Sequence, residues 1–164
     1  MGLLDAIFGS DDNTSTTDLD QWLVTTLKRE LNLDEIERDD DGDIPINCGS
    51  AVVFVRAIPG SEDEADRIEV FAPLLAEFAM RPQVYEAVNE INRQTPIAKA
   101  IVEPDGLQII LQAEIYIFDE LSSAQLMATL NLVADRADHY DSLLQKRFGG
   151  RTMADDDNDD EFDV

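Results

Sequence analysis

The chain has 164 residues, of which 44% are hydrophobic, enough for one domain with a substantial core but not for two ordinary domains. Its 36 acidic residues against 12 basic ones give a formal net charge of −24. A surface of that sign repels phosphate backbones and anionic lipid headgroups. The charge therefore argues against nucleic acids and membrane surfaces as partners, and it leaves neutral or basic segments of other proteins.

The first residues and the single cysteine bear on the cellular compartment. Residues 1–8 are apolar but include Asp5 and no basic residue, whereas a signal peptide needs a basic start and a longer apolar run. No stretch reaches the length of a membrane span. Cys48 is the only cysteine, and no basic residue adjoins it to activate the thiol. We therefore expect a cytoplasmic protein in which Cys48 packs as a small apolar residue.

Composition divides the chain into three zones. Residues 1–17 combine a short apolar patch with a polar run, and we expect a flexible N-terminal segment there. Residues 18–150 carry the periodic patterns of a folded domain. Residues 151–164 are mostly acidic, and like charges at that density cannot be buried together. We expect this last zone to be a disordered acidic tail.

Residues 18–32 are expected to form the first helix, because their large apolar residues fall on one helical face. These residues are Leu19, Trp22, Leu23, Leu27 and Leu31. Thr17 and Asp20 have the spacing of a capping box, with Asp in place of Glu or Gln, and they set the expected start of the helix.

Three strands are expected next, at residues 44–48, 51–58 and 67–75, where β-branched and alternating apolar residues gather. The first two strands are separated only by Gly49-Ser50. Pro73 cannot donate a hydrogen bond to a sheet, so it indicates that the third strand lies at a sheet edge or contains a bulge.

The second half of the chain predicts a helix followed by a hairpin. Residues 82–93 have helical spacing and begin with a proline, which suits a first helical turn. Strands at 97–103 and 107–117 flank the tight turn Pro104-Asp105-Gly106.

The last helix is expected to begin at a capping box formed by Ser122 and Gln125 and to end before Gly149-Gly150. Short connections between consecutive strands favour antiparallel pairing. No strand leads through a glycine-rich phosphate-binding loop into a helix. The predicted fold class is α+β, in the order α-β-β-β-α-β-β-α, with a five-stranded antiparallel sheet packed by helices.

The acidic run before the first strand has part of the pattern of a calcium-binding EF-hand loop. Placing Gly42 at loop position six puts Glu37, Asp39 and Asp41 at positions one, three and five. Position twelve is then Cys48, which cannot supply the required carboxylate, and a strand follows in place of the second helix. We interpret the run as a solvated turn, and we expect no metal and no cofactor.

His139 is the only histidine, so a zinc site or a Ser-His-Asp or Cys-His arrangement would have to use it. Nothing in the sequence places a second ligand or a nucleophile beside it. Acidic residues are so frequent that no single carboxylate pair is informative. We expect a surface histidine, and we identify no catalytic residue.

Alternation along the strands gives the predicted sheet one apolar face and one mixed face. On the mixed face, large apolar side chains stand among charged and amide groups, and they are the candidate binding residues. These are Phe54, Phe71, Ile101, Ile110 and Tyr116. Something is expected to cover such a face: one of the protein's own helices, a dimer partner, or a peptide of another protein held in a groove.

The element order resembles the fold of type III secretion chaperones and the related YbjN family. Short strings over residues 18–150 resemble actinobacterial YbjN-like proteins: Asp40-Asp41-Gly42-Asp43-Ile44, Asn89-Glu90-Ile91-Asn92, Ala134-Asp135 and Phe148-Gly149-Gly150. The resemblance implies a non-enzymatic, often dimeric domain that holds a segment of another protein. It implies no catalytic residues.

Three hypotheses for function follow. The leading one is a non-enzymatic, chaperone-like domain that binds a segment of a client protein, as a homodimer. The main alternative is a self-associating regulatory or scaffold protein with no client peptide. An enzyme of unknown class is the third.

Overall fold

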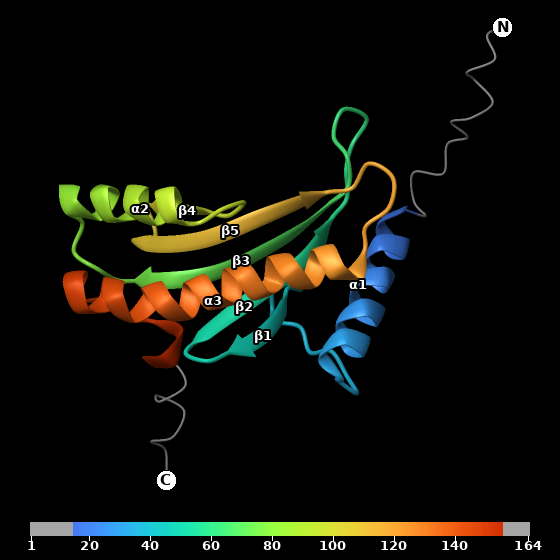
Figure 1. The fold of residues 1–164 in the computed structure, drawn as a ribbon, viewed down its shortest axis with the longest axis horizontal. Coiled ribbons are helices and arrows are strands. Elements are labelled where there is room, and N and C mark those ends of the chain that lie inside the picture. Colours follow the sequence, from blue (N-terminus) through green and yellow to red (C-terminus); the bar gives the residue numbers. More distant parts are fainter. Residues whose placement is uncertain (1–14, 156–164) are drawn as a thin grey trace, which may run out of the picture.

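In the described part of the chain, helices and strands follow one another in the order expected from the sequence (Figure 1). The computed structural model describes residues 15–155, with side chains from residue 18 onward. The elements are α1 (Ser15–Leu31), β1 (Ile44–Cys48), β2 (Ala51–Ile58), β3 (Arg67–Ala76), α2 (Pro82–Gln94), β4 (Lys99–Glu103), β5 (Gln108–Tyr116) and α3 (Ser123–Phe148). The predicted α+β class and the predicted order are both confirmed.

The strands form one five-stranded antiparallel sheet in the order β1-β2-β3-β5-β4. The first three strands make a meander and the last two make a hairpin, and the two parts join where β3 pairs with β5. Pro73 therefore lies on a central strand, so the edge alternative is wrong. The bulge alternative is confirmed, because the β3–β5 register shifts between Pro73 and Leu75.

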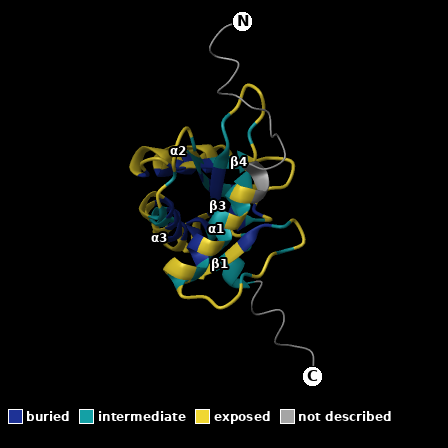
Figure 2. Ribbon diagram, turned by 90° about the vertical axis from the view of Figure 1, so that its right-hand side faces the viewer, coloured by how far each residue is buried: buried dark blue, intermediate teal, exposed yellow. Residues whose placement is uncertain are grey.

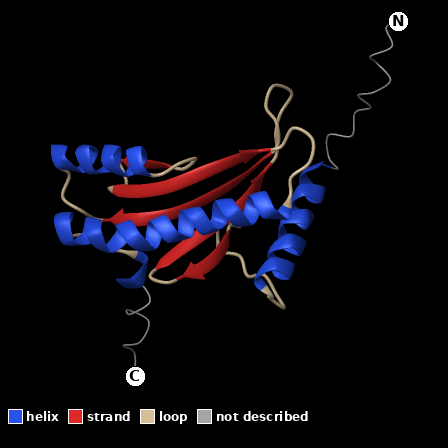
Figure 3. Cartoon of the chain, viewed as in Figure 1, coloured by secondary structure: helices blue, strands red, loops and turns tan. Residues whose placement is uncertain are grey.

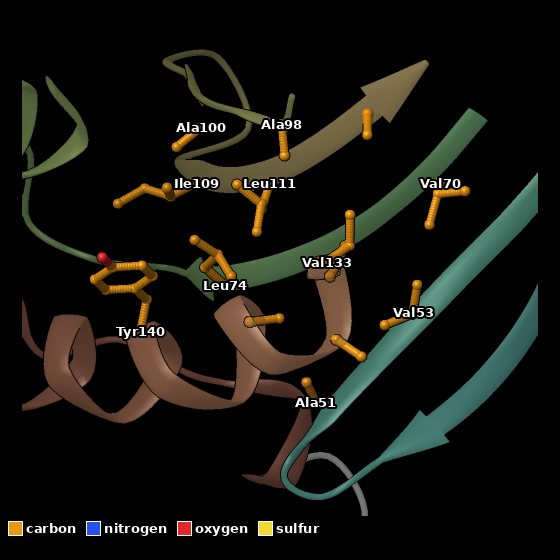
Figure 4. Close-up of a cluster of buried hydrophobic side chains, with 14 of the residues drawn as sticks. Ala51, Val53, Val70, Leu74, Ala98, Ala100, Ile109, Leu111, Val133 and Tyr140 are labelled. Carbon is orange, nitrogen blue, oxygen red and sulfur yellow. The ribbon is translucent and has the colours of Figure 1, made fainter. Parts of the chain in front are cut away.

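Helices α2 and α3 lie on the same side of the sheet, and α1 stands at one end of it (Figures 1, 2 and 3). Apolar side chains from α3 and from β2, β3, β4 and β5 point toward one another between the two layers (Figure 4). Val53, Val70, Leu74, Leu111 and Val133 are completely buried there. The predicted apolar face of the sheet thus packs in the core, and the opposite face of the sheet points toward solvent.

The two predicted helix starts have different outcomes. Ser122 and Gln125 form the expected capping box of α3, with each side chain accepting a hydrogen bond from the backbone of the other. Helix α1, however, begins at Ser15, so Thr17 lies inside the helix and not at its cap. Asp20 instead receives two hydrogen bonds from Arg38 in the following loop, at 2.8 and 3.0 Å.

The folded domain extends beyond the expected boundary at residue 150. Ala76 and Arg151 exchange two backbone hydrogen bonds of 2.8 Å, and Thr152 is buried, so residues 151–155 belong to the body. Gly150 permits this approach because its φ is +88° and an added Cβ would collide with the carbonyl oxygen of Ala76. The expected flexible segment and acidic tail otherwise fall on residues 1–14 and 156–164, outside the described residues.

Candidate functional site

The face of the sheet opposite the helices carries the candidate binding residues. We call it the open face, and it comprises Phe54, Arg56, Arg67, Glu69, Phe71, Pro73, Lys99, Ile101, Glu103, Gln108, Ile110, Gln112, Glu114 and Tyr116. Helices α2 and α3 lie on the other side (Figure 2). Within residues 15–155, therefore, the alternative that one of the protein's own helices covers this face is wrong.

A hollow of about 440 Å³ lies on the open face. Its floor is apolar, and at its centre the rings of Phe54 and Phe71 stack with centroids 5.3 Å apart and planes 15° from parallel. The two residues are register partners on β2 and β3. Three further apolar side chains extend the floor across the sheet: Pro73, Ile101 and Ile110.

Arg56 stands beside the stacked rings and is held by three neighbours. Its guanidinium lies 5.0 Å from the centroid of the Phe71 ring. One nitrogen is 2.7 Å from Glu69 and another is 3.5 Å from Asp43. The open face therefore combines an aromatic floor with charged groups that are already paired.

The acidic turn before β1 forms one side of the hollow, through Asp39, Asp41 and Asp43. The Asp39 carboxylate accepts hydrogen bonds from the backbone N–H groups of Asp41 and Asp43, at 3.0 and 2.8 Å, so the turn is closed by its own residues. Cys48 lies at the opposite end of β1 from Asp43. Among the described residues, no group of three or more histidine, cysteine or acidic side chains is placed to hold a metal ion.

Burial raises the pKa of the Asp43 carboxyl above its ordinary value. The positive charge of Arg56 opposes this rise, and the carboxylates of Asp39, Asp41 and Glu69 add to it. The acidic side of the hollow thus already holds negative charges that repel one another, a setting that favours the approach of a cation.

Four of the five predicted binding residues line the hollow: Phe54, Phe71, Ile101 and Ile110. Tyr116 does not. It lies six residues along β5 from Ile110, roughly 20 Å at about 3.3 Å per residue. Its ring stacks on Phe118 with centroids 6.3 Å apart, and Arg67 lies over it at 5.9 Å.

The charged residues of the hollow were not predicted as binding residues from the sequence: Arg56, Glu69, Glu103 and the acidic turn. A usable signal was the two-residue connection Gly49-Ser50, which fixes the β1–β2 register. That register pairs Ile44 with Val55, so Asp43 comes next to Arg56.

Both edges of the sheet are blunted against the addition of another strand. On β4, the Asn92 amide donates to the carbonyl oxygen of Ala100 at 3.0 Å and accepts from its N–H at 2.6 Å. On β1, Pro45 has no N–H to offer to a neighbouring strand. Because edge strands invite pairing with other chains, these features direct binding away from the edges.

Cys48 and His139 are the remaining side chains that could take part in chemistry, and both are involved in packing. Burial raises the pKa of the Cys48 thiol, and the nearby carboxylates of Asp135 and Asp138 raise it further, which disfavours the reactive thiolate. His139 is exposed on α3, its ring edge-on to that of Tyr140 with centroids 4.8 Å apart.

In the described chain, no helix has the length and apolar character needed to cross a membrane.

Residues 17–156 match the family model TY-Chap1, described as the T3SS (YopN, CesT) and YbjN peptide-binding chaperone 1. The chain belongs to the TY-Chap1 family. The resemblance inferred from the sequence is thereby confirmed, and the TY-Chap1 match covers the whole described domain apart from the first two residues of α1. None of the curated proteins is significantly similar to the chain in sequence.

Solved structures share the fold of this TY-Chap1 domain at low sequence identity. A chain of the ExsC–ExsE complex is 18% identical, with a TM-score of 0.58 over 79% of this chain and 95% of that one. A chain of the HopA1–SchA chaperone–effector complex is 11% identical, with a TM-score of 0.59 over 79% and 98%. The Yersinia pestis type III secretion chaperone SycH, in complex with a fragment of YscM2, gives 20% identity and a TM-score of 0.50 over 73% and 97%.

Proposed function

We propose that this protein is a non-enzymatic chaperone-like domain whose open face holds a short extended segment of a client protein. The observation that carries the proposal is the stacked Phe54–Phe71 floor of a hollow that faces solvent. Membership of a family described as peptide-binding chaperones supports it, as do the chaperone and effector complexes whose chains share the fold.

The apolar floor would supply most of the affinity. Burying one aromatic side chain of the client against it contributes roughly 1.5–3 kcal/mol. The floor reaches from β2 to β4, which is three strand spacings of about 4.8 Å, or about 14 Å. At about 3.3 Å per residue, an extended segment of four or five residues fills it.

Substitution of Phe54 by Asp tests the proposal. The full-length protein is immobilised and used to select from a phage-displayed library of random 12-residue peptides. Wild type should enrich peptides with apolar residues, whereas Phe54→Asp should stay folded, because Phe54 is only partly buried, and should enrich none. Tyr85→Asp is the matched control, since it places the same charge at an exposed aromatic on α2, in the helical layer.

Circular dichroism and light scattering on each variant separate loss of binding from loss of fold or a change in assembly. If Phe54→Asp does not fold, Ile101→Ser provides a milder change on the same floor. The proposal is wrong if wild type enriches nothing, or if a folded floor variant enriches the same peptides as wild type.

We also propose that the protein is a cytoplasmic homodimer. Large apolar side chains remain exposed outside the hollow, which supports self-association. They include Ile97, Phe118 and Leu143. Light scattering at tens of micromolar should give twice the 18.3 kDa mass of the chain, and a monomer mass would refute the dimer.

A further inference from the structure

The hollow on the open face is acidic at both ends. Among its lining residues are five carboxylates, Asp39, Asp41, Asp43, Glu69 and Glu103, against the single guanidinium of Arg56. The acidic turn lies on the β1 side of the hollow, and Glu103 ends β4 on the other side. The apolar floor lies between the two.

The lone positive charge in the hollow is already engaged. Arg56 pairs with Glu69 and Asp43 and covers the Phe71 ring, so it offers little attraction to an acidic segment. The carboxylates of Asp41 and Glu103 are exposed at the two ends. An incoming cation can therefore reach them without burial, whereas an anion meets an excess of like charge.

We propose that the hollow selects client segments with an apolar centre of about four residues flanked by arginine or lysine, the centre lying on the aromatic floor and the cations at the acidic turn and Glu103. This proposal rests on the proposed function and adds the chemistry of the client. The overall charge of −24 would draw such segments toward the protein, and the two acidic ends would fix where their cations rest.

The state of Asp43 agrees with this arrangement. Its pKa is raised, first by burial and then by the carboxylates of Asp39, Asp41 and Glu69, with Arg56 opposing them. A cation docked at the turn would lower that pKa again, so binding should weaken as the pH falls and Asp43 takes up a proton.

The test compares two double variants that remove the same amount of charge. Asp41→Asn with Glu103→Gln neutralises the two ends of the hollow. The fold should survive, because Asp41 contributes its backbone N–H and not its carboxylate to the turn. Asp63→Asn with Glu86→Gln is the control, since both residues are exposed and lie outside the hollow, in the β2–β3 loop and on α2.

The probes are the random 12-residue phage library and then the most enriched synthetic peptide, paired with an analogue in which citrulline replaces arginine or norleucine replaces lysine. Wild type and the control variant should enrich basic residues beside apolar ones. The hollow variant should keep the apolar preference and lose the basic one. By fluorescence anisotropy in 100 mM salt, each lost charge pair should weaken binding about two- to fivefold.

The outcomes distinguish this proposal from the one on which it rests. Apolar peptides enriched without basic residues, or an equal loss in both double variants, would overturn the charge selection and leave peptide binding intact. No enrichment by wild type would overturn both. If Phe54→Asp still enriches the same peptides, the binding site lies outside the hollow, and the proposed selection of basic residues by Asp41 and Glu103 is wrong.

Discussion

Asp138 on α3 fastens the β1–β2 turn to the helix. Its carboxylate accepts hydrogen bonds from the backbone N–H and the hydroxyl of Ser50, at 2.8 and 2.9 Å. The preceding Gly49 has a φ of +65°, and an added Cβ there would collide with the same carboxylate. The single proton of that hydroxyl is shared with a second carboxylate, that of the buried Asp141, whose oxygen lies 2.6 Å from the Ser50 hydroxyl oxygen. The turn that sets the β1–β2 register is thus held from outside the sheet.

These bonds predict a pH dependence of stability. The backbone N–H of Ser50, followed by its hydroxyl, lowers the pKa of Asp138. A lowered pKa stabilises the fold above the unfolded value of about 4, and that contribution is lost as the pH falls through the folded value. Asp138→Asn should therefore unfold at a lower temperature than wild type at pH 7 and lose less stability between pH 4 and pH 2.5.

Thermal unfolding followed by circular dichroism over this range measures the effect. Asp135→Asn, one turn earlier on α3, changes the net charge equally and serves as the control. Identical pH profiles for the two variants would contradict the role of Asp138.

At the scale of single elements, the Asn92 side chain occupies backbone hydrogen-bonding groups at the edge of β4 that could otherwise pair with a strand of another chain. Asn92→Ala would leave the N–H and C=O of Ala100 without their present partner at the edge of β4. We expect a loss of about 1–2 kcal/mol and more self-association, because an uncapped edge pairs with other chains. Urea unfolding and light scattering measure the two effects.

Asn89→Ala, an exposed position one turn earlier on α2, controls for the change in helix propensity. If the Asn92 and Asn89 variants were equally stable and equally monodisperse, the guarding role of Asn92 would be wrong.

The elements that the sequence predicted well are those fixed by local chemistry. Residues 44–48 and 51–58 were predicted to the residue, because a two-residue turn and alternation determine both strands. Pro73 left two alternatives open, since only the pairing of β3 with the distant β5 decides between edge and bulge. The start of α1 was missed because Thr17 and Asp20 have the spacing of a capping box, whereas the helix begins at Ser15 and Asp20 pairs with Arg38, eighteen residues away.

In the candidate site too, local patterns were predictable from the sequence and contacts between distant segments were not. Alternation on each strand placed the five apolar residues on one face, but it could not say which of them meet. Strand order decides this, because it brings Ile101 and Ile110 together and puts the Phe54–Phe71 pair next to them. Tyr116 is on the same face and yet at the far end of β5.

At the scale of the whole molecule, the charge of −24 predicts a stability that rises with salt. Repulsion among like charges opposes the compact state, and ions screen it. Raising NaCl from 20 to 300 mM should stabilise the fold by about 1 kcal/mol, or roughly 2–4 °C in the melting temperature. A neutral osmolyte at equal osmolality is the control, and a melting temperature that falls or stays constant in NaCl would contradict the prediction.

The seam between β3 and β5 has a consequence for how the chain acquires its structure. The β1–β2–β3 meander and the β4–β5 hairpin each form from neighbouring segments, whereas the seam joins strands separated in sequence by α2 and β4. Its formation must first meet the entropy cost of closing that loop, and such non-local pairing slows folding. The hollow crosses this seam, since Phe71 lies on one side and Ile110 on the other. We therefore expect the Phe54–Phe71 part of the floor to form with the meander, and the complete floor to form only once β3 and β5 have paired.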